Sequence, residues 1–252
     1  MGSRAALVSF LLLSSLLGAC SQAHDEKETE REVGPPLTTG QIRSALLTSQ
    51  DLGKQFVSVP PDSDDSDPHD LGCLGKVDRA VENGPQPLRE VTAAFEPRTQ
   101  LKSPSIETTV ATFKSARAAA SSLDLMLREQ RKCTRADVRD DGTRFRFQVR
   151  VDDLAVAHEA DQQVTTSAAV DVSGRGLRFP MTVEITLVRI GRNAVAVAMF
   201  DMQDSLQGAR RALTDAAMDR LVAVMEGRKP PRPERLLSAY PFVKPRDLAA
   251  GL

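Results

Sequence analysis

The chain has 252 residues, of which 27% are charged, 41% are hydrophobic and 4% are aromatic, with a formal net charge of −1. These proportions are typical of a soluble globular protein and exclude the disordered, collagen-like and disulfide-dense classes. The chain lacks the excess of basic residues that nucleic-acid-binding proteins usually carry. It has no Trp and a single Tyr, so an aromatic platform on which bases could stack is not expected either. We therefore expect no nucleic-acid partner.

Residues 1–19 predict a lipoprotein signal peptide. Arg4 supplies the positive charge, and about thirteen mostly apolar residues follow, from Ala5 to Leu17. A helix of that length, rising about 1.5 Å per residue, falls short of the ~30 Å hydrocarbon core, which favours a cleaved signal over a membrane-spanning helix. The run ends in LGAC at Cys20, which resembles the bacterial lipobox, and this implies that Cys20 is lipidated. An ordinary secretory signal is the alternative.

A lipidated Cys20 predicts where the protein is located. One acyl chain gives marginal membrane binding, whereas two or three, such as a diacylglycerol with a palmitate, anchor a protein stably. We therefore expect a protein anchored to the extracytoplasmic face of the cell membrane. No later stretch approaches 18 consecutive apolar residues.

Two cysteines remain, Cys73 and Cys133. Pairing is the default for two cysteines in an exported, oxidising setting, so a Cys73–Cys133 disulfide is predicted. Two buried thiols are the alternative. A metal site is disfavoured because zinc sites use closely spaced cysteine pairs.

The mature chain divides into three segments. Residues 20–37 are charged and nearly free of apolar side chains, which predicts a flexible tether. Residues 38–227 carry the alternating and helical patterns of a folded domain, and residues 228–252 hold five prolines and a net positive charge, which predicts an irregular tail.

Within residues 38–227, local patterns and caps predict helices and strands in this order. They are a helix from Thr38 or Thr39 to Leu47 that ends by Asp51-Leu52-Gly53, a strand Phe56–Val59, a short helix Leu71–Val81, strands Leu88–Pro97 and Ser105–Phe113, a helix capped by Ser115 and ending before Cys133, strands Thr143–Val151, Gln163–Val172, Phe179–Ile190 and Ala194–Phe200, and a helix Ser205–Met225.

Strands in consecutive runs with short turns form antiparallel sheets, and helices between the runs pack on them. The order of the elements therefore predicts an α+β fold, a single domain in which an antiparallel sheet packs with about three helices.

Catalytic and metal-binding signatures are absent from the sequence. It contains no G-x-S-x-G, H-E-x-x-H, C-x-x-C, Walker A or G-x-G-x-x-G motif. His24, His69 and His158 are isolated in predicted loops, and the acidic loop at residues 62–67 lacks the glycine and glutamate of a calcium loop. We expect no catalytic residue, no cofactor and no metal ion.

Two groups of basic residues stand out, and a solvated surface is the simplest interpretation of both. The alternative is contact with anionic lipid or wall polymer. The first group lies on one face of the strand Thr143–Val151, and the second in the tail: Arg144, Arg146 and Arg150; Arg228, Lys229, Arg232 and Arg235.

The chain resembles actinobacterial lipoproteins and sensor modules with a PknH-like extracellular domain, found outside certain membrane serine/threonine kinases. The resemblance is carried by LLTSQDLG at residues 46–53, Cys73, a strand ending near Phe113, the Ala-rich helix from Ser115, and Cys133. It implies a single α+β domain with a sensing or ligand-binding role and no catalysis. The kinase sensor has a second disulfide and tryptophans, which this chain lacks.

These observations favour a lipid-anchored, extracytoplasmic binding or sensor-like module that takes a small molecule, a lipid or a cell-wall ligand. A structural or partner-docking envelope lipoprotein is the first alternative. A wall-active hydrolase is the second, because two carboxylates can converge in space without a sequence motif.

Overall fold

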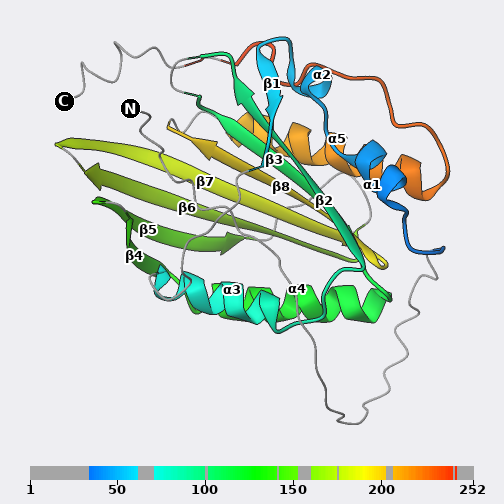
Figure 1. Ribbon diagram of the computed structural model, residues 1–252, viewed down its shortest axis with the longest axis horizontal. Helices are drawn as coiled ribbons and strands as arrows, with labels where there is room; N and C mark the ends of the chain where they lie inside the picture. Colours follow the sequence, from blue (N-terminus) through cyan, green and yellow to red (C-terminus); the bar gives the residue numbers. More distant parts are fainter. Residues whose placement is uncertain are drawn as a thin grey trace, which may run out of the picture.

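The fold is built around one antiparallel sheet of eight strands in the order β1-β2-β3-β8-β7-β6-β5-β4 (Figure 1). The computed structural model describes residues 34–61, 71–99, 102–140, 142–152, 160–174, 176–202, 207–240 and 242. The strands are β1 Phe56–Val59, β2 Arg89–Pro97, β3 Ser105–Thr112, β4 Arg135–Asp140, β5 Thr143–Asp152, β6 Gln162–Gly174, β7 Leu177–Ile190 and β8 Asn193–Asp201.

Five helices accompany the sheet in the part of the chain that is described. They are α1 Thr39–Ala45, α2 Ser49–Leu52, α3 Leu74–Glu82, α4 Ala116–Gln130 and α5 Gln207–Met225. The predicted α+β class with an antiparallel sheet is confirmed. None of these helices is long and apolar enough to cross a membrane.

The sheet consists of two sets of sequentially paired strands, here called the two meanders, and the connection from β1 to β2 in the first of them carries α3. Strands β1 to β3 follow one another as antiparallel neighbours, and so do β4 to β8. Helix α4 connects the two meanders, and β8 then pairs with β3, with Ser105 opposite Phe200 and Thr112 opposite Asn193. This single long-range pairing joins the two meanders into one sheet.

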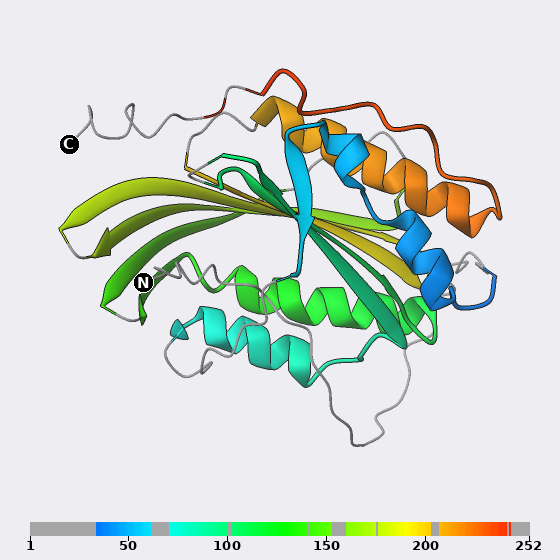
Figure 2. The same ribbon diagram turned by 45° about the horizontal axis from the view of Figure 1, so that its top comes forward.

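The helices lie on opposite sides of the sheet (Figure 2). On one side, α1 and α5 cover β2, β3 and β8, and the largest apolar cluster fills the space between them. On the other side, α3 and α4 pack together, and Gln130 of α4 accepts a hydrogen bond from Thr166 of β6. Helix α4 begins where predicted, because the Ser115 hydroxyl accepts a hydrogen bond from the Ala118 amide.

A separate helix, α2 at Ser49–Leu52, follows α1, which corrects the prediction of one helix continuing to Asp51-Leu52-Gly53. Leu46 has an extended backbone, and Thr48 starts α2 with a capping box in which its backbone and hydroxyl both donate to Asp51. Thr48 is therefore a second helix start inside the segment, and the helical pattern of the apolar residues does not reveal it.

Asp51 also forms a buried ion pair with Arg220 of α5, at 3.4 Å, and both side chains are at most 10% exposed. Arg220 donates from Nε to the carbonyl of Leu46 at 2.6 Å and from Nη2 to that of Ser44 at 2.9 Å. The guanidinium thus satisfies two carbonyls at the end of α1 as well as the carboxylate, and it locks α1, α2 and α5 together.

The described part of the tail has no helix or strand, and it is packed on the fold. The amides of Leu236 and Leu237 donate to the carbonyls of Asp51 and Leu52, and Leu237 is only 2% exposed. Further along, Tyr240 donates to Asp201 at the end of β8. The tail therefore adds to the cover that α1, α2 and α5 form on one side of the sheet.

Strand β4 is the one strand that the sequence did not predict. Its residues alternate charged side chains with Ala136 and Val138, so the strand offers little apolar signal of its own. It is an edge strand, held by pairing with β5 along its whole length.

Candidate functional site

One half of the sheet has a face that no helix of the described chain covers. Helix α5 extends only as far as β7, where Arg210 near its start donates to Glu184 at 2.6 Å. Beyond that contact, on the same side, β6, β5 and β4 carry no helix (Figures 1 and 2). This uncovered face is the candidate site because its side chains are open to a partner.

The alternation of β5 determines which side chains lie there. Phe145, Phe147 and Val149 are buried toward α3 and α4, so the residues between them point to the uncovered face. Strand register places Arg139 opposite Arg144 and continues the face onto β7. We call the six arginines of this surface the arginine face: Arg135, Arg139, Arg144, Arg146, Arg150 and Arg178.

Two aspartates neutralise part of the arginine face. Asp137 of β4 accepts hydrogen bonds from Arg144, including one from Nε at 2.8 Å, and Asp171 of β6 pairs with Arg178 at 3.3 Å. The hydrogen bond from Arg144, with the charges of Arg146 and Arg139 nearby, holds the pKa of Asp137 below its usual range. Asp137 and Asp171 thus pair with two of the six guanidiniums, those of Arg144 and Arg178.

The other four arginines, namely Arg135, Arg139, Arg146 and Arg150, are exposed and form no ion pair with a described residue. Counting Asp152 at the end of β5, the face carries six positive and three negative charges, a net charge of +3. The prediction of a basic outer face on this strand is confirmed. Arg135 and Arg139 extend it from β4, which the sequence did not identify as a strand.

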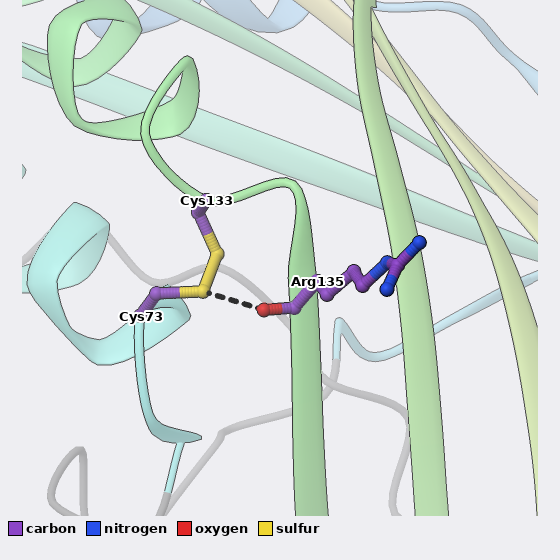
Figure 3. Close-up of a disulfide and its surroundings, with 3 residues drawn as sticks. All are labelled: Cys73, Cys133 and Arg135. Carbon is purple, nitrogen blue, oxygen red and sulfur yellow. Dashed lines mark hydrogen bonds between the residues drawn. A yellow bond between two sulfur atoms is a disulfide. The ribbon is translucent and has the colours of Figure 1, made fainter.

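The disulfide fixes the edge of this half of the molecule. Cys73, at the start of α3, bonds to Cys133, which follows α4, with 5.4 Å between their Cα atoms. Figure 3 shows the Arg135 side chain extending away from this bond, while the Arg135 carbonyl oxygen lies 3.1 Å from Cys73 Sγ. The predicted pairing of the two cysteines is confirmed, and it ties the first residues of β4 to α3 and α4.

A second chemically unusual group is Glu90 on β2. It lies on the side of the sheet that faces α4, opposite Ala111 of β3, which packs against Ala119 of α4. Burial raises the pKa of Glu90 to about 7, and its Oε2 accepts no hydrogen bond from a described residue. The sequence pattern does not reveal this buried carboxyl group, because a glutamate in an alternating strand is usually solvated.

Several residues singled out in the sequence lie outside the described residues. They are Cys20, His24, His69, His158 and the acidic loop at residues 62–67. Within the described ranges, no group of three or more His, Cys, Asp or Glu side chains is placed to hold a metal ion. The tail residues Arg228, Lys229, Arg232 and Arg235 lie in the chain between the end of α5 and Leu236–Leu237, which pair with α2, whereas the arginine face lies on β4, β5 and β7.

The fold is that of the PknH extracellular domain from Mycobacterium tuberculosis. The two share 14% identity with a TM-score of 0.56, over 76% of this chain and 98% of that one. A putative uncharacterised protein from Mycobacterium smegmatis aligns over 72% of this chain and 94% of its own, at 12% identity and a TM-score of 0.37. No protein-family model and no curated protein matches the sequence.

Proposed function

We propose that this protein is a lipid-anchored, extracytoplasmic binding module of the sensor type, and that it does not catalyse a reaction. The fold that it shares with the extracellular domain of PknH supports this location and role. The observation that carries the proposal is the Cys73–Cys133 disulfide within that fold, because such bonds form and persist in oxidising compartments outside the cytoplasm.

The anchor in this proposal is Cys20, in the sequence LGAC. Two or more acyl chains on this residue are sufficient for stable membrane attachment. The charged segment that follows Cys20 then separates the bilayer from the folded domain, which already includes the buried Leu37, so the predicted tether of residues 20–37 ends before that residue.

Membrane fractionation of cells that produce Cys20→Ala tests the anchor. We expect the variant to leave the membrane fraction, while the matched control Ser21→Ala stays there after a high-salt wash and yields an acylated N-terminal peptide by mass spectrometry. Retention of Cys20→Ala in salt-washed membranes overturns the proposed lipid anchor.

A ligand screen tests binding against catalysis. The purified protein is heated with muropeptides, phospholipids and wall oligosaccharides, and the same mixtures are then analysed for cleavage products by mass spectrometry. We expect a rise in the melting temperature with at least one class and no turnover of any. Cleavage of a wall fragment overturns the non-catalytic role.

A further inference from the structure

We propose that the arginine face is a docking surface for anionic phospholipid headgroups, so that this side of the sheet lies against the bilayer. The proposed lipid anchor would bring the domain to the membrane, but the binding step itself rests on the arginines alone. Three features of the face favour phospholipid headgroups: the spacing of its arginines, the small or polar residues between them, and its net positive charge.

The four arginines that form no ion pair with a described residue are spread over a surface and do not converge on a point. Arg135 and Arg139 lie four residues apart on β4, and Arg146 and Arg150 four residues apart on the neighbouring β5. In a sheet this separates each pair by about 13 Å along its strand, with about 4.8 Å between the strands. Four exposed guanidiniums laid out in this way match an array of phosphates better than one small anion, which needs converging donors.

The residues between the arginines favour a lipid surface over a protein partner. Protein interfaces have a desolvated centre rich in aromatic and other apolar side chains. Here the uncharged neighbours are small or polar: Gln148, Ser167, Ala169, Ser173, Pro180 and Thr182. The only large hydrophobic side chain that is exposed among the described residues, Leu88, lies just before β2 in the other half of the sheet.

The lack of an apolar anchor on this face also predicts how the contact behaves. Binding is electrostatic, without insertion into the acyl layer, so it weakens steeply with salt. The chain as a whole carries a formal net charge of −1, which does not favour an anionic membrane. Attraction must therefore come from the local arrangement of the arginines, and substitutions at this face are a specific test.

The test uses the mature chain, residues 20–252, with Cys20→Ser, so that no acyl chain contributes. Co-sedimentation is measured with vesicles of phosphatidylcholine alone and of phosphatidylcholine with phosphatidylglycerol, at low salt and at about 0.15 M salt. We expect binding only to the anionic vesicles, and less of it at the higher salt concentration.

The decisive variant is Arg139→Gln/Arg146→Gln/Arg150→Gln. Each basic residue near an anionic surface raises the membrane partition coefficient by about fivefold. The loss of three such residues should therefore lower that coefficient by about a hundredfold. The matched control is Arg117→Gln/Arg128→Gln/Arg131→Gln, which removes the same charge from exposed positions on or just after α4, on the opposite side of the sheet. We expect the control to bind within a few-fold of the parent. Thermal unfolding establishes that both variants are folded.

Three results overturn the proposal: no binding to anionic vesicles, equal binding to neutral ones, or equal loss in the two triple variants. Binding of soluble polyphosphate without binding of vesicles also overturns it and identifies the face as a polymer site. None of these results depends on acylation of Cys20, so the vesicle assay and the fractionation of Cys20→Ala can fail separately.

Discussion

The two halves of the sheet are stabilised in different ways. The closed half, made of β1, β2, β3 and β8 with α1, α2, α5 and the tail, is built around a cluster of 21 buried apolar residues among those described, two of which, Val188 and Ile190, come from the adjacent β7. The open half, made of β4 to β7 with α3 and α4, has 10, and one of its faces is left to arginines. The closed half secures its helices with a buried ion pair, and the open half with a disulfide.

This difference indicates a division of roles. A half-sheet with one face exposed buries less apolar surface for the same length of strand, so a covalent link between α3 and the start of β4 compensates for a thin core. The closed half buries enough apolar surface to tolerate the buried ion pair between Asp51 and Arg220. The half with the smaller core is also the half that presents the candidate binding surface.

Removing the disulfide is expected to have the largest effect on stability. The bond spans 60 residues, and a loop of that size corresponds to about 4 kcal/mol in the chain-entropy account. Cys73→Ser/Cys133→Ser should lower the free energy of unfolding by about that amount, as measured by urea denaturation.

Hydrogen exchange on the same double variant locates the effect. Amides of β4 and β5 should lose protection first, and those of β3 and β8 last. Equal loss across both halves would show that the disulfide does not act on the open half in particular.

Breaking the buried ion pair tests the closed half. Arg220→Ala leaves the Asp51 carboxylate buried without its partner and two carbonyls of residues 44 and 46 without a donor. We expect a loss of about 3 kcal/mol. The control Arg211→Ala removes an exposed pair on the same helix, with Asp215, and should cost less than about 0.5 kcal/mol. Similar losses in the two variants would contradict the role given to Arg220.

Glu90 offers a contrast with Asp51, because no basic side chain among the described residues pairs with its buried carboxyl group. Its pKa rises from 4.5 in the unfolded chain to about 7 in the fold, so between these values the native state binds more protons. The free energy of unfolding therefore falls by about 3 kcal/mol as the pH rises from about 4.5 to about 7, and it is constant at higher pH.

Glu90→Gln should remove this dependence. The difference in unfolding free energy between the parent and the variant is measured by urea denaturation from pH 4 to pH 8. It should change by about 3 kcal/mol across that window, with the variant gaining relative to the parent as the pH rises. A difference that stays flat with pH would mean that the Glu90 carboxyl is solvated in the native state.

Local patterns account for most of the elements. Alternation identified β5 and its two faces, and the Ser115 cap identified the start of α4, because both signals come from residues a few positions apart. Strand β4 escaped because an edge strand rich in charge has little apolar alternation. The break at Leu46 escaped because Thr48 competes as a cap inside an apolar pattern.

The candidate site was predictable only in part. Arg144, Arg146 and Arg150 were identified from the alternation of a single strand. Arg135 and Arg139 joined them only through the pairing of β4 with β5. Glu90 could not be identified, because its burial comes from the packing of α4 over β2 and β3, which no local pattern encodes.

The sequence by itself determined the periodicity of each strand and helix, the polarity of the two faces of β5, and the two cysteines available for pairing. Tertiary structure alone decided that β8 joins β3, that α5 stops at β7, and that Asp51 meets Arg220 across 169 positions of the chain. The physical reason is distance along the chain. Periodicity and capping depend on neighbours within a few residues, whereas the burial of a charge or the exposure of a sheet face depends on which remote segments pack over it.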